Sequence, residues 1–255
     1  MSYQNLFNLS DKVVLVSGAA GGLAEETCLA LAEFGASVFL ADIDPEGLTR
    51  VSDRLAAAKS PIAAQTVDIT DPSSVQSLMN TVQKQFGRLD ILINFAGVGW
   101  RTPIESINFE EFQKVVTINL TGSFLLVKHS LPLMLPNGSG KIILVGSVSG
   151  QIGRPYVAHY SASKGGVHAM VRSMAVELAP RNIQINSVAP AFTLTQMTKE
   201  ILGDPEVKQS IINTIPMGRL GLAADLVATM ILLSSSGSDF ITGQTIFVDG
   251  GCTSS

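Results

Sequence analysis

The sequence predicts an α/β fold in which a doubly wound, parallel β-sheet is flanked by helices on both faces. Short, nearly continuous apolar segments rich in Val and Ile alternate with amphipathic helical segments along the chain. Strands without a polar side must be buried on both faces, and parallel strands need helical crossovers between them. The length of 255 residues fits one such unit, and no linker-like change in composition divides it, so we expect a single domain over residues 1–255.

Each strand is predicted from a short run of β-branched and other apolar residues. In chain order, these runs lie at 12–17, 37–42, 62–68, 89–97, 141–147, 183–190 and 244–251. Between them, apolar residues recur at helical spacing. The helical segments lie at 23–34, 44–58, 71–86, 109–135 and 161–178. Because strands and helices alternate, the helices can cross from strand to strand on both sides of the sheet.

Boundary residues support several of these elements. Asp71-Pro72 combines a capping aspartate with a first-turn proline, and Gly35 and Gly87 lie where helices should end. A longer connection at about 192–217 has weak periodicity and two prolines. It follows a strand at the carboxyl edge of the sheet, where ligand crevices form, so we expect a mobile loop over a substrate; a plain surface excursion is the alternative.

Charge and hydropathy exclude several classes of partner. The formal charge is -4 with a pI near 5.4 and no basic run, which disfavours nucleic acid and anionic lipid. No apolar stretch approaches the ~20 residues that cross a bilayer, so no membrane span is expected. With 46% apolar and only 15% charged residues, part of the surface should be covered by other subunits. We therefore expect a homo-oligomer that acts on a small molecule.

The two cysteines, Cys28 and Cys252, are far apart and form no CxxC pattern. A disulfide framework is therefore not expected. The start of the chain lacks the pattern of a secretory signal peptide. Both observations favour a cytoplasmic location. The three histidines form no HExxH pair, so no metal site is expected.

A glycine-rich turn follows the first predicted strand. In "SGAAGGLA", residues 17–24, the glycines permit a tight turn and let backbone amides approach a pyrophosphate at a helix N-terminus. Asp42 ends the next strand 20 residues after Gly22. A carboxylate there can bind the ribose hydroxyls and repel a 2′-phosphate, which favours NAD over NADP. The alternatives are an ordinary strand-to-helix connection and a turn-capping aspartate.

Tyr160 and Lys164 lie four residues apart in a predicted helix, so they should share one helix face. A phenol is too weakly acidic to act as a base at neutral pH, but a nearby ammonium favours the phenolate. The pair could therefore transfer a proton to or from a reactant. A surface tyrosine beside a solvated lysine is the alternative explanation for this short pattern alone.

Nearly the full chain resembles the short-chain dehydrogenase/reductase family, in its single-domain type with a Tyr-x-x-x-Lys active site. The motifs that carry the resemblance are "SGAAGGLA", "NFAG", "TINLTGSF", "VGSVSG", "YSASK", "NSVAPAFTLT" and "ITGQTIFVDGG". The resemblance implies a Rossmann-type, nucleotide-binding fold, a carbonyl or alcohol substrate, and subunits that pair through 109–135 and 161–178, with a homotetramer favoured.

By the same resemblance, the catalytic set is Asn119, Ser147, Tyr160 and Lys164. Tyr160 would exchange the proton with the substrate oxygen, and Ser147 would bind that oxygen. Lys164 would lower the pKa of Tyr160 and bind the cofactor ribose. Asn119 would hold its helix locally open and support a water in a proton relay to Lys164.

The resemblance also implies the residues that bind the cofactor NAD. They are Gly18, Gly22, Leu23, Asp42, Ile43, Asp68, Ile69, Asn94, Ala96, Gly97, Tyr160, Lys164, Pro190, Thr193 and Thr195. Asp68 has an alternative role as the cap of the turn that leads to Asp71-Pro72. Four positions depart from the family pattern without removing a reacting group: Ser17, Ala24, Phe95 and Ala191.

The substrate pocket is expected to be lined by 99–101, 148–159 and 192–217. Trp100 and Phe192 suggest an apolar side, whereas Gln151, Arg154 and His159 could bind hydroxyls or a carboxylate. We therefore expect a secondary alcohol or ketone on a small polar molecule such as a sugar, polyol or oxo-acid. A 3-oxoacyl thioester is the alternative substrate, and a non-catalytic NAD(H) sensor is the alternative function. A hydrolase is disfavoured, because Val148 occupies the nucleophile position of a G-x-S-x-G motif.

Overall fold

A parallel sheet forms the centre of the computed structural model, which describes residues 3–58, 60–199 and 201–254. Within these residues the sheet has seven strands in the order β3-β2-β1-β4-β5-β6-β7, and all pairs are parallel. The strands are β1 (Val13–Ser17), β2 (Ser37–Asp42), β3 (Ile62–Thr66), β4 (Ile91–Asn94), β5 (Gly140–Val145), β6 (Ile183–Pro190) and β7 (Thr245–Val248). The chain winds outward from β1 in both directions, which confirms the predicted fold class.

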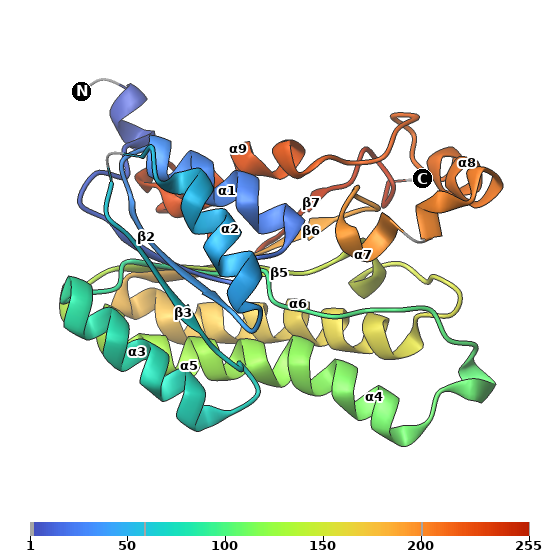
Figure 1. The fold of residues 1–255 in the computed structure, drawn as a ribbon, viewed down its shortest axis with the longest axis horizontal. Coiled ribbons are helices and arrows are strands. Elements are labelled where there is room, and N and C mark those ends of the chain that lie inside the picture. The colour runs from blue at the N-terminus through green and yellow to red at the C-terminus, as the bar shows by residue number, and fades with distance from the viewer. Residues whose placement is uncertain (1–2, 59, 200, 255) are drawn as a thin grey trace.

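Helices cover both faces of this sheet (Figure 1). Their bounds are α1 (Gly22–Glu33), α2 (Pro45–Leu55), α3 (Pro72–Phe86), α4 (Phe109–Val116), α5 (Gly122–Met134), α6 (Ala158–Leu178), α7 (Gln196–Lys199), α8 (Pro205–Asn213) and α9 (Ala223–Ser234). Helices α1, α2 and α9 lie on one side of the sheet, and α3, α4, α5 and α6 lie on the other. None of the described helices is both long enough and apolar enough to cross a membrane.

Two apolar layers hold the helices to the sheet, and β1 contributes to both. Val14 and Val16 join the layer under α1 and α9, whereas Val13 and Leu15 join the layer under α3, α5 and α6. All five residues of β1 are buried. Burial of one such side chain stabilises a fold by about 1.5–3 kcal/mol. The continuous apolar strands of the sequence are therefore explained by a sheet with no solvent-exposed face.

The boundary residues predicted for α1 and α3 agree with the structure, whereas α2 ends at Leu55 rather than at 58 and α6 begins at Ala158 rather than at 161. The Asp71 carboxylate accepts a hydrogen bond from the Ser73 backbone N–H at 2.9 Å, and Pro72 occupies the first turn of α3. Gly87 ends that helix in the left-handed conformation, with φ of 72°. Gly35 follows α1 with φ of 97°. Local capping chemistry therefore sets these ends.

Other elements differ from the sequence-based expectation. The helix predicted at 109–135 is α4 and α5 joined by a π-helical turn at Thr117–Thr121. The connection at 192–217 contains α7, a short 3₁₀ helix at Ile201–Gly203 and α8, rather than irregular loop alone. Asp204 caps α8 just as Asp71 caps α3, so this signal was present in the sequence. Helix α9 was not predicted, because its own residues are apolar on nearly every side and show no alternation of apolar and polar faces.

Two glycines with the same backbone conformation provide a matched test of the β1–α1 turn. Gly18 and Gly87 both have φ of 72°, but a Cβ on Gly18 would lie 2.3 Å from the backbone nitrogen of Ala96, whereas one on Gly87 would meet nothing within 4 Å. Gly87→Ala should cost about 1 kcal/mol of unfolding free energy from backbone strain alone. Gly18→Ala should cost at least twice as much, measured by urea denaturation. Equal costs for the two variants would contradict the proposed close packing at Gly18.

Candidate functional site

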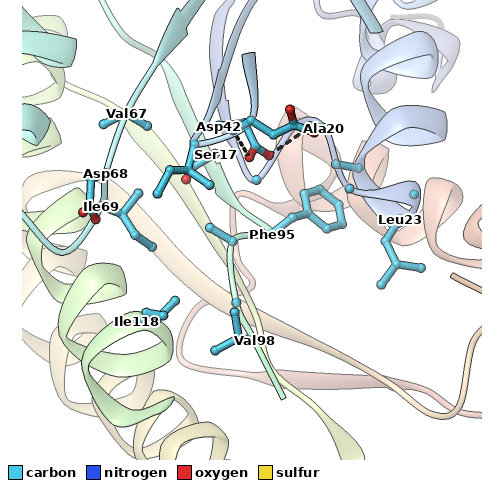
Figure 2. Close-up of a pocket in the computed structure, with 18 of the residues that line it drawn as sticks. Ser17, Ala20, Leu23, Asp42, Val67, Asp68, Ile69, Phe95, Val98 and Ile118 are labelled. Atoms are coloured by element: carbon cyan, nitrogen blue, oxygen red, sulfur yellow. Dashed lines mark hydrogen bonds between the residues drawn. The ribbon is translucent and has the colours of Figure 1, made fainter. Parts of the chain in front are cut away.

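A cavity of about 490 Å³ opens at the carboxyl ends of β1, β2 and β4 (Figure 2). Ten of the predicted cofactor residues line it: Gly18, Gly22, Leu23, Asp42, Ile43, Asp68, Ile69, Ala96, Gly97 and Thr195. Gly21, a glycine of the predicted pyrophosphate turn, also lines it, as do residues not predicted to bind the cofactor: Ser17, Ala20, Ala24, Asp44, Val67, Thr70, Phe95, Val98 and Ile118. Most of these are neighbours of predicted residues at a strand end, so their position alone could have indicated them.

The turn between β1 and α1 forms one side of this cavity. Gly21 precedes α1 and makes no side-chain capping hydrogen bond to the first turn of the helix. The N–H groups of Ala24 and Glu25 already donate to the Gly21 carbonyl, so those of Gly22 and Leu23 are the ones that can bind an anion, with the helix dipole favouring negative charge. Because Gly21 and Gly22 have no side chains, a ligand can reach these N–H groups. This geometry suits a pyrophosphate.

Asp42, at the end of β2, is fixed by two backbone N–H groups. Its Oδ2 accepts from Ala20 at 2.9 Å and its Oδ1 accepts from Asp44 at 3.1 Å (Figure 2). Each carboxylate oxygen has a second lone pair available for a ligand hydroxyl. The glycine turn and the acidic residue thus act as one rigid unit.

A cation also lies beside this unit, which the sequence analysis did not foresee. Arg50 of α2 donates from Nη2 to the Ala20 carbonyl at 2.8 Å and pairs through Nη1 with Glu25. No Lys or Arg adjoins Asp42 in the sequence; Arg50 reaches the turn only because the following helix, α2, brings it there. Both signs of charge are therefore present near the site expected for the adenosine ribose.

Two predicted cofactor residues also have structural roles. Asn94 is buried and does not line this cavity. Its Oδ1 accepts from the Ala96 N–H, and its Nδ2 donates to Ser123 Oγ, both at 2.9 Å. It therefore supports the cavity from behind. Asp68 lines the cavity and also accepts from the Thr70 N–H at 2.8 Å, so it caps a turn as the alternative interpretation held.

Asn119 lies in the π-helical turn and is fully buried. Its Oδ1 accepts from the Val98 N–H, and its Nδ2 donates to the Val98 carbonyl, both at 2.8 Å. Nδ2 also lies 3.0 Å from Ser163 Oγ on α6. The wider turn thus lets one side chain connect the segment after β4 to α6, in line with the locally open helix expected from the sequence.

Tyr160 and Lys164 occupy the first two turns of α6, and Ser147 follows β5. Loss of hydration raises the pKa of Tyr160, while a hydrogen bond with the Ser147 side chain lowers it. Lys164 Nζ donates to the Val145 carbonyl at 2.7 Å and lies 5.8 Å from the centroid of the Tyr160 ring. Burial lowers the pKa of Lys164 to about 8. Lys164 is not among the groups that shift the pKa of Tyr160, whose net shift is upward, so a lowering of the tyrosine pKa by Lys164 stays a prediction.

A second cavity, of about 160 Å³, contains the Ser147–Tyr160 pair. Leu23 and Thr195 line both cavities. The other residues that line the smaller one are Gly99, Trp100, Arg101, Val148, Ser149, Arg154, Val157, Pro190, Ala191, Phe192, Thr193 and Thr198. All three predicted substrate segments contribute, and Pro190 and Thr193 lie here rather than in the larger cavity.

Two residues proposed for substrate contact do not line this cavity. Gln151 is exposed outside it, and His159 is completely buried. His159 packs edge-on against Trp100 with ring centroids 5.9 Å apart, and its Nε2 lies 3.4 Å from Glu111 Oε1. The histidine therefore supports the tryptophan instead of contacting a substrate.

Glu111 of α4 is the residue that fixes this side of the cavity, and the sequence analysis missed it. Its Oε1 accepts from Thr102 Oγ1 at 2.5 Å and from Trp100 Nε1 at 2.7 Å. These two hydrogen bonds lower the pKa of Glu111. No motif surrounds Glu111 in the sequence, because its role arises only when α4 packs beside residues 100–102.

We expect Glu111→Gln to loosen Trp100. The neutral amide is a weaker acceptor than a carboxylate, so the loss should cost about 1–2 kcal/mol of unfolding free energy. It should also lower the fluorescence anisotropy of Trp100, the only tryptophan in the chain. Glu110→Gln, an exposed neighbour with the same charge change, is the matched control. Identical anisotropy in the two variants would rule out this anchoring role.

Comparisons with known proteins agree with this geometry. A family model described as enoyl-(acyl carrier protein) reductase matches residues 18–253. The chain is 34% identical over 244 residues to a 3-oxoacyl-[acyl-carrier-protein] reductase of Thermotoga maritima, covering 95% of this chain and 98% of that protein.

Solved structures of two dehydrogenases superpose on nearly the whole chain. A gluconate 5-dehydrogenase from Burkholderia cenocepacia, in complex with NADP and tartrate, has a TM-score of 0.95 at 29% identity and covers 100% of both chains. An NAD⁺-bound xylitol dehydrogenase has a TM-score of 0.92 at 29% identity, over 95% of this chain and 99% of that one. With the family model and the parallel sheet, these matches show that the chain belongs to the short-chain dehydrogenase/reductase family of oxidoreductases.

Proposed function

We propose that this oxidoreductase uses NAD(H) to interconvert a secondary alcohol and a ketone on a small polar molecule, such as a sugar, a polyol or an oxo-acid. The observation that carries the proposal is that Ser147 and Tyr160 line one small cavity next to a larger, glycine-lined one. The pair can bind and protonate one oxygen, and the larger cavity can hold a dinucleotide.

The residues of the larger cavity fit such a cofactor. A Cβ on Gly97 would lie 3.1 Å from Asn119 Oδ1 and 3.3 Å from Lys164 Nζ, so only glycine leaves this space open. The uncapped turn before α1 would bind the pyrophosphate, Asp42 and Ile43 the adenosine ribose, and Asp68 and Ile69 the adenine. When bound, the nicotinamide supplies the carbon that accepts or gives up a hydride.

The chain's own residues handle the proton. When a substrate alcohol is oxidised, the Tyr160 phenolate accepts its hydroxyl proton, and when a ketone is reduced, the Tyr160 phenol donates that proton to the substrate oxygen. Ser147 hydrogen-bonds the same substrate oxygen and positions it. Lys164, with a pKa of about 8, is suited to exchange protons near neutral pH. Asn119 would support the water that links Lys164 to solvent.

NAD is favoured over NADP by the position of Asp42. Its carboxylate would repel a 2′-phosphate and accept hydrogen bonds from the ribose. Arg50 is the opposing influence, because its guanidinium could pair with a phosphate. That guanidinium is already bound to Glu25 and the Ala20 carbonyl, so Asp42 should dominate. Among the relatives, the xylitol dehydrogenase binds NAD⁺ and the gluconate 5-dehydrogenase binds NADP.

The same relatives favour a sugar or polyol substrate. The alternative, a 3-oxoacyl thioester, is supported by the reductase of Thermotoga maritima. The smaller cavity is lined by two arginines and several hydroxyl groups, which suits a compact polar substrate better than an acyl chain. A non-catalytic sensor would not require the intact proton-transfer pair of Ser147 and Tyr160.

We also propose a homotetramer in the cytoplasm. Large apolar side chains are exposed on the helices predicted to pair: Phe109 (67%) and Phe112 (41%) on α4, Phe124 (41%) on α5 and Val176 (80%) on α6. Another subunit would cover them. Cys28 and Cys252 are both free thiols, as is usual in a reducing compartment.

Tyr160→Phe should lower kcat by about 10²–10⁴-fold, because it removes the proton donor and acceptor. The assay follows reduced nicotinamide absorbance with NADH and NADPH separately against ketones, sugars and oxo-acids. Tyr156→Phe removes a hydroxyl from an exposed neighbour and should leave the rate unchanged. Equal turnover by Tyr160→Phe and the wild type would refute the proton-transfer role.

Asp42→Asn should shift cofactor preference toward NADPH. Loss of the negative charge removes the repulsion of the 2′-phosphate and leaves the Arg50 cation nearby, so the ratio of kcat/KM for NADPH to that for NADH should rise about 10- to 100-fold. Adding Arg50→Gln should reverse part of that rise. An unchanged ratio in the single variant would mean that Asp42 does not select the cofactor.

A further inference from the structure

The smaller cavity has an unusual charge for this acidic chain. Arg101 and Arg154 line it, and none of its lining residues is Asp or Glu. The protein as a whole has a formal charge of -4. A cavity with two cations and no acid attracts an anionic ligand.

Arg101 is exposed, whereas Arg154 is half-buried and has no charged partner among the described residues. Its Nη2 lies against Cys252 Sγ, and its Nη1 reaches Thr214 Oγ1 at a long 3.4 Å. Its guanidinium carbon lies 5.8 Å from the ring centroid of Phe192. Its Nε is buried and has no hydrogen-bond partner among the described residues.

Most other arginines are neutralised. Carboxylates lie within 4.0 Å of the guanidinium nitrogens of Arg50, Arg54, Arg88, Arg181 and Arg219. No carboxylate within residues 3–58, 60–199 and 201–254 lies that close to Arg154. A partly desolvated guanidinium with neutral neighbours is unfavourable unless a ligand supplies the missing charge.

We propose that Arg154 binds a carboxylate of the substrate, so that the enzyme acts on hydroxy acids and oxo-acids. This inference rests on the proposed oxidoreductase function and narrows its substrate class. Arg154 precedes Tyr160 by six residues on the segment that joins β5 to α6. One continuous segment therefore supplies the group that holds the acid and the group that exchanges the proton.

A carboxylate fits this place better than the other candidate groups. The guanidinium is planar and can donate two parallel hydrogen bonds to a carboxylate. Phe192 shields one side of it, and Cys252 and Thr214 limit the space at its tips. A neutral polyol or an uncharged acyl chain would leave the Arg154 charge unpaired.

Matched pairs of ligands test the proposal directly. The pairs are glycerate with glycerol, threonate with threitol and gluconate with glucitol, which differ only in a carboxylate against a hydroxymethyl group. Binding to the enzyme saturated with NAD⁺ is followed by the fluorescence of Trp100, the only tryptophan and a lining residue of the cavity. The enzymes are the wild type, Arg154→Gln, Arg154→Lys and, as a matched control, Arg181→Gln, which removes a charge from the exposed surface.

At least one acid should bind the wild type about 10-fold or more tightly than its neutral partner. Arg154→Gln should weaken that acid about 10- to 100-fold and leave the neutral partner unchanged. Arg154→Lys should retain part of the affinity, because it keeps the charge without the planar fork. Arg181→Gln should match the wild type. Unchanged binding of the neutral partner by Arg154→Gln establishes that its cavity is intact.

The proposal is overturned by equal acid affinity in the wild type and Arg154→Gln, by equal affinity for the members of every pair, or by failure of all three acids to bind. Glycerol phosphate is the additional probe; tighter binding than glycerate, lost in Arg154→Gln, would replace the carboxylate with a phosphate. Fluorescence reports binding without turnover. Acid binding that depends on Arg154 but yields no reduced nicotinamide would therefore refute the proposed reaction and leave the carboxylate site standing.

Discussion

Burial of both faces of the sheet is the constraint on which the rest of this structure depends. Helices cover each face, so a polar side chain in the middle of a strand is unfavourable unless it finds a hydrogen-bond partner, as Asn186 of β6 does with the Ile241 carbonyl and the Gln244 N–H. On the strands that form the site, polar groups lie where the strands end: Ser17 on β1, Asp42 on β2, Asn94 on β4 and Ser147 after β5. Because the strands are parallel, all these ends meet at one edge. The stability of the core and the position of the site thus have the same origin.

Close packing of α6 on β5 extends this constraint to the reacting groups. Tyr160, Lys164 and His168 recur every four residues and share one face of the helix. A Cβ on Gly146 would lie 2.3 Å from His168 Nε2, so glycine is required for the helix to come this near. Burial lowers the pKa of His168 to about 4, with the Lys164 charge acting in the same direction. The imidazole is therefore neutral at physiological pH, and Lys164 is the cation of this face.

Sequence reasoning succeeded where a role depends on local chemistry. Asp71 and Gly87 mark helix ends through their own backbone preferences, and Asp42 is identified by its place at a strand end after a glycine turn. It failed where the role depends on long-range packing. Glu111 becomes a partner of Trp100 only through the fold, and Arg50 reaches the glycine turn from a different helix. His159 was assigned to the substrate from its position beside Tyr160, yet adjacent helix residues face different directions.

The charges around the smaller cavity connect substrate binding to proton transfer. Desolvation raises the pKa of Tyr160, and the hydrogen bond from Ser147 offsets only part of that effect. A phenolate in this place needs positive charge nearby. Lys164 supplies one cation behind the ring, and Arg101 and Arg154 supply two more around the cavity. When an acid neutralises Arg154, Lys164 remains as a cation beside the Tyr160 ring, 5.8 Å from its centroid. The enzyme can therefore use one set of charges to attract its substrate and keep a separate charge for the chemistry.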